Sequence, residues 1–224
     1  MDLFTPEAHT ISKTFLSGQT PVLRVSLCSP ALSGELAGPF NRYNEALTKA
    51  LYHRAETTLF SLAEKDLQAA LWEERPFVCH TLRSDFRLYL TTPTHMSLYT
   101  ETYSYSGGVH GHITASAQTW DIRQGLLLPL SDLFSPGYAW EGRLIAAITA
   151  EAKRRERQNM AEYYPDLTTR IRTYFDPRRY YVTDSTLTVF YPLYALAPYE
   201  TGIPMFSIPF RRFGKNFLLS SASN

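Results

Sequence analysis

The residues best suited to chemistry are two histidines, His110 and His112, on either side of Gly111. In an extended chain both side chains project to the same face, a spacing that some metal sites use. His80 or Glu200 could add further ligands, but no carboxylate or third histidine stands at a defined spacing. The competing interpretation is that both histidines make ordinary hydrogen bonds in a loop. We favour this second interpretation and expect neither a metal nor a cofactor.

The two histidines belong to a glycine-rich stretch, Tyr103-Ser-Tyr-Ser-Gly-Gly-Val-His-Gly-His112. Gly107, Gly108 and Gly111 permit backbone angles that side chains forbid, and they let another surface approach closely. The spacing differs from a dinucleotide-binding fingerprint, and a strand rather than a helix is expected to follow. We therefore expect a turn against which another backbone packs.

Patterns for nucleophilic catalysis are missing from the sequence. There is no Gly-x-Ser-x-Gly elbow, and no pair of acids is marked out by its spacing. Cys28 and Cys79 lie in apolar, strand-like segments, where burial raises the pKa of a thiol and lowers its reactivity. Free buried thiols are the favoured interpretation, and a disulfide across neighbouring strands is the alternative. We expect a protein that is not an enzyme, with no catalytic residues.

The composition and charge argue against nucleic acid as a partner and against a membrane-spanning segment. The chain has 224 residues, 44% hydrophobic, with a formal charge of +1, so no overall field favours nucleic acid. No run approaches the roughly 20 apolar residues of a membrane helix, and the first residues lack the features of an export signal. The 15 tyrosines and 13 phenylalanines suit a core, although tyrosine is also frequent on recognition surfaces.

The hydrophobic periodicity predicts the elements that must position these residues. We expect an irregular lead-in at 1–19 and a helix from Pro39 to about Trp72, where apolar residues recur at helical spacing. Further helices are expected at 139–160 and 166–175, and strands at 22–28, 85–91, 97–105, 113–122, 180–183, 187–191 and 206–210.

This order predicts an α+β fold with antiparallel sheets, each packed by a long helix. We expect two intimately joined parts, 20–125 and 126–213, with flanking segments at 1–19 and 214–224. Glycine at position 125 is expected to close a tight reversal.

Two groups of tyrosines are candidates for recognition. The odd positions of the strand at 97–105, which include Tyr99, Tyr103 and Tyr105, form a polar and aromatic face that would meet water or a partner. Tyr191, Tyr194 and Tyr199 accompany a proline-rich segment, which prolines make stiff.

Three motifs carry a resemblance to a known family. They are Tyr103-x-Tyr-x-Gly-Gly-x-His-Gly, then Trp120-Asp-x-x-x-Gly-x-x-Leu-x-Leu-x-Asp-Leu-Phe, then Phe190-Tyr-Pro-Leu-Tyr-Ala-Leu-Ala-Pro-Tyr-Glu-Thr-Gly-Ile-Pro. In this order the chain, from about Val22 to Phe210, resembles the extracytoplasmic domain of RsiV-type anti-sigma factors. This domain also occurs as an accessory domain in PdaC-like peptidoglycan deacetylases and in many stand-alone bacterial proteins of unknown function.

The resemblance implies a non-catalytic binding or sensor module of a bacterial envelope or secreted protein. RsiV binds lysozyme through loops of this domain, so the resemblance implies a protein partner (lysozyme-like) or a cell-wall ligand. The corresponding surfaces are the loops at 106–112 and 191–204. Together with two tyrosines of the strand face before the first loop, they give these candidate binding residues: Tyr103, Tyr105, Gly107, Gly108, His110, Gly111, Tyr191, Tyr194 and Tyr199. The chain lacks a membrane helix, a sigma-binding segment and a deacetylase domain, so neither of those activities is expected.

Two alternatives stay open beside this interpretation. The first is an envelope-acting hydrolase that uses His110 or His112 as a base or metal ligand. The second is a purely structural or oligomer-forming domain.

Overall fold

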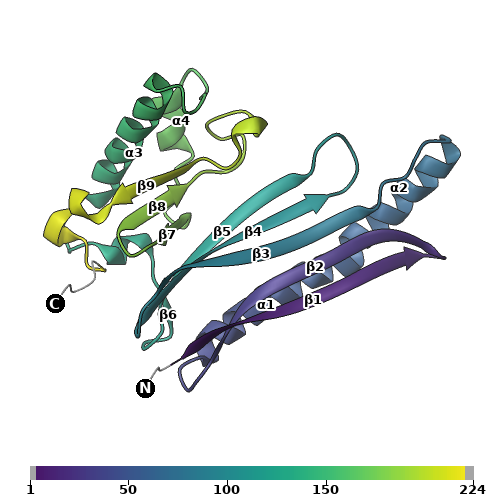
Figure 1. The fold of residues 1–224 in the computed structure, drawn as a ribbon, viewed down its shortest axis with the longest axis horizontal. Helices are drawn as coiled ribbons and strands as arrows, with labels where there is room; N and C mark the ends of the chain where they lie inside the picture. The colour runs from purple at the N-terminus through teal and green to yellow at the C-terminus, as the bar shows by residue number, and fades with distance from the viewer. Residues whose placement is uncertain (1–3, 220–224) are drawn as a thin grey trace. The chain divides into compact units, whose positions relative to one another are not determined.

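The structure is a computed structural model that describes residues 4–219, and its elements confirm the predicted α+β class (Figure 1). The strands are β1 (Thr5–Ser17), β2 (Thr20–Ser33), β3 (His80–Thr91), β4 (His95–Tyr105), β5 (His112–Asp121), β6 (Leu126–Leu127), β7 (Tyr180–Val182), β8 (Thr186–Phe190) and β9 (Met205–Pro209). The helices are α1 (Gly38–Arg54), α2 (Phe60–Trp72), α3 (Trp140–Arg157) and α4 (Leu167–Thr173), with a π-helical turn at Ala55–Leu59 and 3-10 turns at Leu130–Leu133, Tyr199–Thr201, Phe210–Arg212 and Gly214–Asn216.

The strands form two sheets, one in the order β1-β2-β3-β4-β5-β6 and one in the order β7-β8-β9. The β7–β8 pair is antiparallel, as the predicted hairpin requires, and the β1–β2, β5–β6 and β8–β9 pairs are antiparallel as well. The β2–β3 pair is parallel, with Leu23 opposite His80, which differs from the antiparallel expectation. The reason is the long helical connection: a crossover of that length returns the chain to the same end of the sheet, so the next strand runs in the same direction.

The expected irregular lead-in is wrong for most of its length, because Thr5–Ser17 forms β1 and pairs with β2 from Thr5↔Ser33 to Ser17↔Thr20. Residues 1–3 and 220–224 of the predicted flanking segments lie outside the described part. The side chains of β1 are almost all exposed, so the strand lacks the alternation of apolar and polar residues by which a half-buried strand is recognised. Backbone pairing with β2, rather than side-chain burial, holds it in the sheet.

The chain groups into two compact units. Unit 1 combines the chain up to Arg87 with Thr100–Thr114, and unit 2 combines Leu88–Tyr99 with the chain from Ala115 onward. Because β3, β4 and β5 each pass from one unit to the other, neither unit is a single continuous segment of the sequence.

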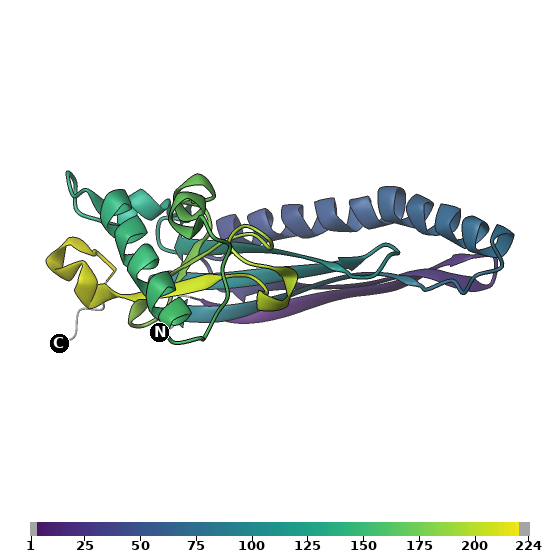
Figure 2. The same cartoon turned by 90° about the horizontal axis from the view of Figure 1, so that it is seen from above.

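In unit 1 the helical run 38–72 lies along one face of the strands (Figure 2). Pro39 sits in the first turn of α1, where its missing N–H costs nothing. The run is continuous through its π-helical turn, which confirms the predicted long helix. Its inner side joins β2 and β3 in one core, with buried side chains at Val22, Leu23, Val25, Leu27, Ala55, Leu59, Ala63, Leu67 and Leu82.

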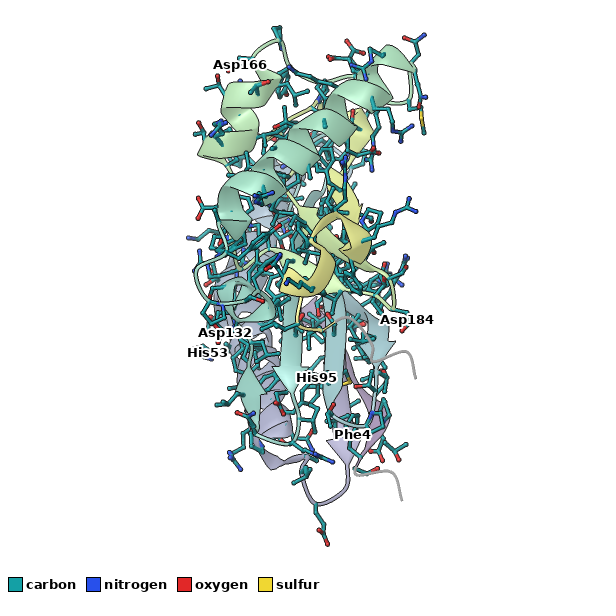
Figure 3. The ribbon with its side chains drawn as sticks, turned by 90° about the vertical axis from the view of Figure 1, so that its left-hand side faces the viewer. Phe4, His53, His95, Asp132, Asp166 and Asp184 are labelled. Atoms are coloured by element: carbon teal, nitrogen blue, oxygen red, sulfur yellow. The ribbon has the colours of Figure 1, made fainter. Side chains whose placement is uncertain are left out.

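In unit 2 the helices α3 and α4 cover the small sheet. The apolar stripe of α3 is buried at Leu144, Ile145 and Ile148, as its spacing predicts. Asp166, labelled in Figure 3, precedes α4. It accepts a 2.6 Å hydrogen bond from Arg170 one turn later. The core contains further aromatic and aliphatic side chains, among them Tyr163, Leu167, Ile171, Val189, Tyr191, Leu196, Phe206 and Phe217. Within the described residues, no helix is both long and apolar enough to cross a membrane.

Candidate functional site

The glycine loop, residues 106–111, joins β4 to β5 in unit 1. Gly107 and Gly108 both have positive φ, +89° and +94°, so two consecutive residues occupy the region that glycine tolerates best. The hydroxyl of Tyr105 donates a 3.0 Å hydrogen bond to the carbonyl of Gly108. The backbone of the loop is therefore bent by glycines and held by a tyrosine from the strand before it.

The end of the loop packs directly on Tyr103. A β carbon added to Gly111 would lie 2.2 Å from the Tyr103 ring, a distance that no real side chain tolerates. The tip of the loop faces solvent, with Val109 88% exposed and both His110 and His112 exposed. The structure thus brings Tyr103, Tyr105 and the glycines together, and both tyrosines are half-buried and lie against the loop.

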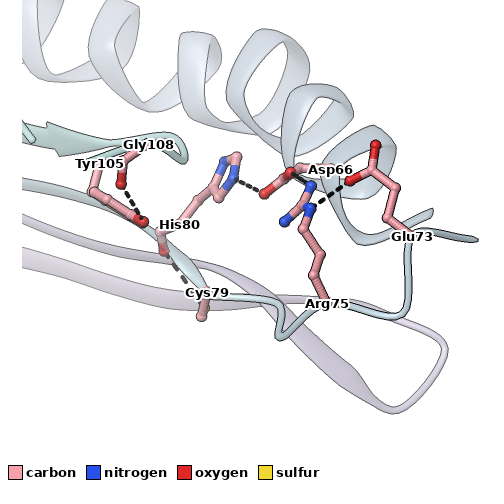
Figure 4. A network of polar contacts seen from close by, with 7 residues as sticks. All are labelled: Asp66, Glu73, Arg75, Cys79, His80, Tyr105 and Gly108. Atoms are coloured by element: carbon pink, nitrogen blue, oxygen red, sulfur yellow. Dashed lines mark hydrogen bonds and ion pairs between the residues drawn. The ribbon is translucent and has the colours of Figure 1, made fainter. Parts of the chain in front are cut away.

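A buried histidine lies against the other side of the loop. His80 begins β3 and is fully buried, and its Nε2 lies 3.1 Å from Oδ2 of Asp66 on α2 (Figure 4). The ring stacks on Phe77, with centroids 5.9 Å apart, and meets the edge of Tyr105 at 6.3 Å. A β carbon on Gly107 would lie 3.6 Å from Oδ2 of Asp66 and 3.9 Å from Nε2 of His80, so the loop passes close to the Asp66–His80 pair.

The pair is extended by charged residues from the turn after α2. Arg75 donates a 2.6 Å hydrogen bond to Oδ1 of Asp66 and a 2.7 Å hydrogen bond to Glu73. The hydrogen bond from Arg75, and then that with His80, lowers the pKa of Asp66 against an opposing effect of burial. Asp66 is therefore a carboxylate at neutral pH, and Nε2 of His80 must carry the proton that it donates.

The second ring nitrogen of His80, Nδ1, is buried and has no hydrogen-bond partner within residues 4–219. The only thiol nearby in sequence, Cys79, points its Sγ to the His80 carbonyl at 3.5 Å, and burial raises the pKa of Cys79. His80 is closed off from solvent. Through its contact with Asp66 it links the start of β3 to α2.

The alternative of a metal site at His110 and His112 gains no further ligands from the described residues. Within residues 4–219, no group of three or more histidine, cysteine or acidic side chains lies close enough to hold a metal ion. Cys28 and Cys79 are free. In the parallel register Leu23 lies opposite His80, so Cys79 falls beside Val22, six residues along β2 from Cys28, a separation of roughly 20 Å at the rise of a strand.

The tyrosine loop, residues 191–204 in unit 2, divides into a buried and an exposed part. Tyr191 was expected at a docking surface, but it is fully buried. Its hydroxyl donates a 3.2 Å hydrogen bond to the carbonyl of Ile171, and burial raises its pKa. Tyr191 therefore belongs to the core. Tyr99 of β4 was likewise expected at a surface and is buried, 5.2 Å from the ring of Phe190.

The exposed part of the tyrosine loop keeps two of the predicted residues together. The rings of Tyr194 and Tyr199 lie 5.8 Å apart, and Tyr194 is 48% exposed. Tyr194 has a positive φ of 64°, which is uncommon for a bulky residue and shows that its neighbours fix the backbone there.

Sequence reasoning missed Asp66, Arg75 and Val109 and considered His80 only as a metal ligand. A signal for Asp66 exists: it lies three residues after Ala63 and four before Ala70, both buried, so helical spacing turns it toward the core. A carboxylate there needs a partner. Nothing in the sequence identifies that partner as His80, because the pairing depends on the parallel register of β3.

Comparisons with solved structures show that other proteins share this fold. A member of the DUF3298 family from Bacteroides fragilis matches with a TM-score of 0.69 and 14% identity, over 96% of this chain and 93% of that one. A DUF3298 family protein from Pseudomonas aeruginosa matches with a TM-score of 0.59 and 16% identity, over the same shares of the two chains. At such identities the likeness shows the fold alone. No curated protein matches the chain.

A family model matches the C-terminal part of the chain, including the tyrosine loop and all of the three-stranded sheet. Neither this match nor the two structures bears on the RsiV or PdaC likeness. Residues 131–211 thus match the model of the family described as "Protein of unknown function (DUF3298)".

Proposed function

We propose that the protein is a non-catalytic binding module that recognises its ligand through the glycine loop, the tyrosine loop, or both. The observation that carries this proposal is the close packing of Gly111 on Tyr103. A loop held in one shape loses little conformational entropy on binding, so a larger part of each contact contributes to affinity. The exposed Val109 gives this loop an apolar side chain at its tip.

The tyrosine loop supports the same proposal from different residues. Tyr194 and Tyr199 present adjacent rings on a stiff, proline-rich backbone. Tyrosine combines a large contact area with a hydroxyl and has few rotatable bonds, which makes it effective in recognition.

The ligand class and location rest on the resemblance to RsiV-type domains. We propose a lysozyme-like protein or a cell-wall fragment as ligand, in an extracytoplasmic or secreted setting. The formal charge of +1 gives little electrostatic steering toward a basic lysozyme, so affinity should depend weakly on salt.

Binding of the purified chain to lysozymes and to soluble peptidoglycan fragments, measured by biolayer interferometry, tests this proposal. We expect Val109→Asp, or the pair Tyr194→Ala and Tyr199→Ala, to weaken binding at least about tenfold, the effect of losing an anchor worth ~1.4 kcal/mol. Leu126→Asp changes another exposed apolar residue and should leave binding unchanged.

Two results would contradict the proposal. One is wild-type affinity for every bound ligand in both loop variants. The other is turnover of peptidoglycan that disappears in His110→Ala, which would instead support the envelope-acting hydrolase.

A further inference from the structure

The strand β1 leaves one long side of the six-stranded sheet open. It stands at the end of the strand order, and within the described residues no strand pairs with its outer side. In an antiparallel pair, every second residue turns its N–H and C=O away from the partner strand, so β1 presents a row of unpaired backbone groups. Such an edge is a template for pairing with another strand.

The open edge is regular over residues 7–14. Pro6 lacks an N–H at one end, and the register with β2 shifts between Phe15 and Leu16 at the other. Every residue between these limits is exposed. Proline, bulges and edge charges are the usual means of blocking an edge. Here the proline and the register shift lie outside residues 7–14, whereas charged residues lie within this stretch.

Those charges are opposite in sign and symmetrically placed. Glu7 and Lys13 lie three residues on either side of Thr10. When two copies of β1 pair antiparallel about a twofold axis through Thr10, Glu7 of each copy faces Lys13 of the other. The two residues lie on the same face of the strand, because they are an even number of positions apart. Each dimer then contains this pair twice, as a twofold interface requires.

Neighbouring registers lack this match. Centring the axis on Ile11 places His9 opposite Lys13, and centring it on His9 places Glu7 opposite Ile11. Shifts by a single residue would turn one strand to the wrong face. The present contacts of the two charges do not compete strongly: Glu7 lies 3.8 Å from His9, and Lys13 lies 5.2 Å above the Phe15 ring, both at the surface, where such contacts contribute little.

We propose that two copies of this chain associate edge to edge through β1, in the antiparallel register that places Thr10 opposite Thr10. The association adds backbone hydrogen bonds along the open edge, two Glu7–Lys13 pairs and a central threonine pair, each a favourable cross-strand contact. The interface uses none of the residues of the two proposed docking loops.

Charge reversal tests the register. Sedimentation velocity of the whole chain at low salt, from low micromolar to near-millimolar protein, should show a concentration-dependent dimer. Glu7→Lys or Lys13→Glu should weaken it about tenfold, since each places two like-charged pairs across the axis. The double reversal should restore it. Lys49→Glu on α1 is the matched control, because its side chain is 78% exposed and lies outside β1.

Disulfide trapping tests the axis directly. In a chain with Cys28→Ser and Cys79→Ser, Thr10→Cys should give the most cross-linked dimer, since facing Cα atoms about 4.5–5.5 Å apart are within disulfide range. His9→Cys and Ile11→Cys should give less. Circular dichroism checks that each variant is folded. A monomer at every concentration, a double reversal that fails to restore the dimer, or strongest cross-linking away from position 10 overturns the proposal.

Discussion

His80 is buried and, within the described part of the chain, only one of its two ring nitrogens has a hydrogen-bond partner, so the stability of its position depends on that partner. His80 has Asp66, and Asp66 in turn accepts a hydrogen bond from Arg75. The carboxylate thus satisfies a buried donor and a surface cation together. Loss of this carboxylate removes the acceptor of both hydrogen bonds, and it also removes a group that lies close to Gly107.

The first prediction concerns this carboxylate. Asp66→Asn should lower the free energy of unfolding by about 1–3 kcal/mol, because one or both donors lose a charged acceptor. Glu73→Gln is the control: Glu73 also accepts from Arg75, but its side chain is 57% exposed, so the cost should stay below about 1 kcal/mol. Urea denaturation measures both. Equal losses of unfolding free energy in the two variants would contradict this prediction, because they would show that the more buried carboxylate contributes no more stability than the exposed one.

A second prediction concerns pH and Glu151 on α3. Hydrogen bonds from Arg154, and then from Arg155, lower the pKa of Glu151 from 4.5 to about 2. Because the folded pKa lies below the unfolded value, this stabilisation is present above pH 4.5 and is lost as pH falls toward 2. Solvent screening reduces it to about 1–2 kcal/mol. Thermal denaturation should show a shallower fall in stability over this window in Glu151→Gln than in the wild type.

At the scale of elements, the helices and strands that bury one side were predicted from the sequence, and those without a buried side were not. The helical run 38–72 and α3 were predicted because one side of each is apolar and buried. The strand β1 was missed because it has no buried side, and Tyr191 was misplaced because a proline-rich segment resembles a loop whether or not its first residue enters the core.

The candidate site was predicted only in part, for a related reason. The glycine loop and its two tyrosines are adjacent in the sequence, so they were found together. Asp66 and His80 come from α2 and β3 and meet because β3 pairs parallel to β2. Local patterns carry no information on that register, and hence none on the pair.

The third prediction concerns the contact between Gly111 and Tyr103. Gly111→Ala should destabilise the chain by about 1–3 kcal/mol, the usual cost of overpacking, because the new β carbon collides with the ring. Adding Tyr103→Ala removes the obstacle, so the double variant should lose less stability than the sum of the single variants. A double-mutant cycle in urea measures this coupling. Additive losses would mean that the two residues are not in contact.

At the scale of the whole molecule, the interleaving of the units limits where the chain can be divided. Unit 2 includes a segment of β3 and β4 that precedes its other residues. From this segment Leu90 enters the core, Tyr99 packs on Phe190, and Ser97 accepts a 3.0 Å hydrogen bond from the Val182 N–H.

The fourth prediction follows from this arrangement. A fragment of residues 126–213 contains the whole match to the family model yet lacks Leu90, Ser97 and Tyr99, so it should show no cooperative thermal transition. A fragment of residues 88–219 keeps every described segment of unit 2 and should unfold cooperatively. Circular dichroism on heating distinguishes the two. A sharp transition in the shorter fragment would contradict the prediction.

The close packing of Gly111 on the ring of Tyr103 also restricts which residues related proteins can carry at these two positions. A relative that acquires a larger residue at the first position must acquire a smaller one at the second position before it or at the same time, since the larger residue alone would collide with the ring. In an alignment of relatives with this loop, the two columns should therefore vary together, and a tyrosine in the second column should always accompany a glycine in the first.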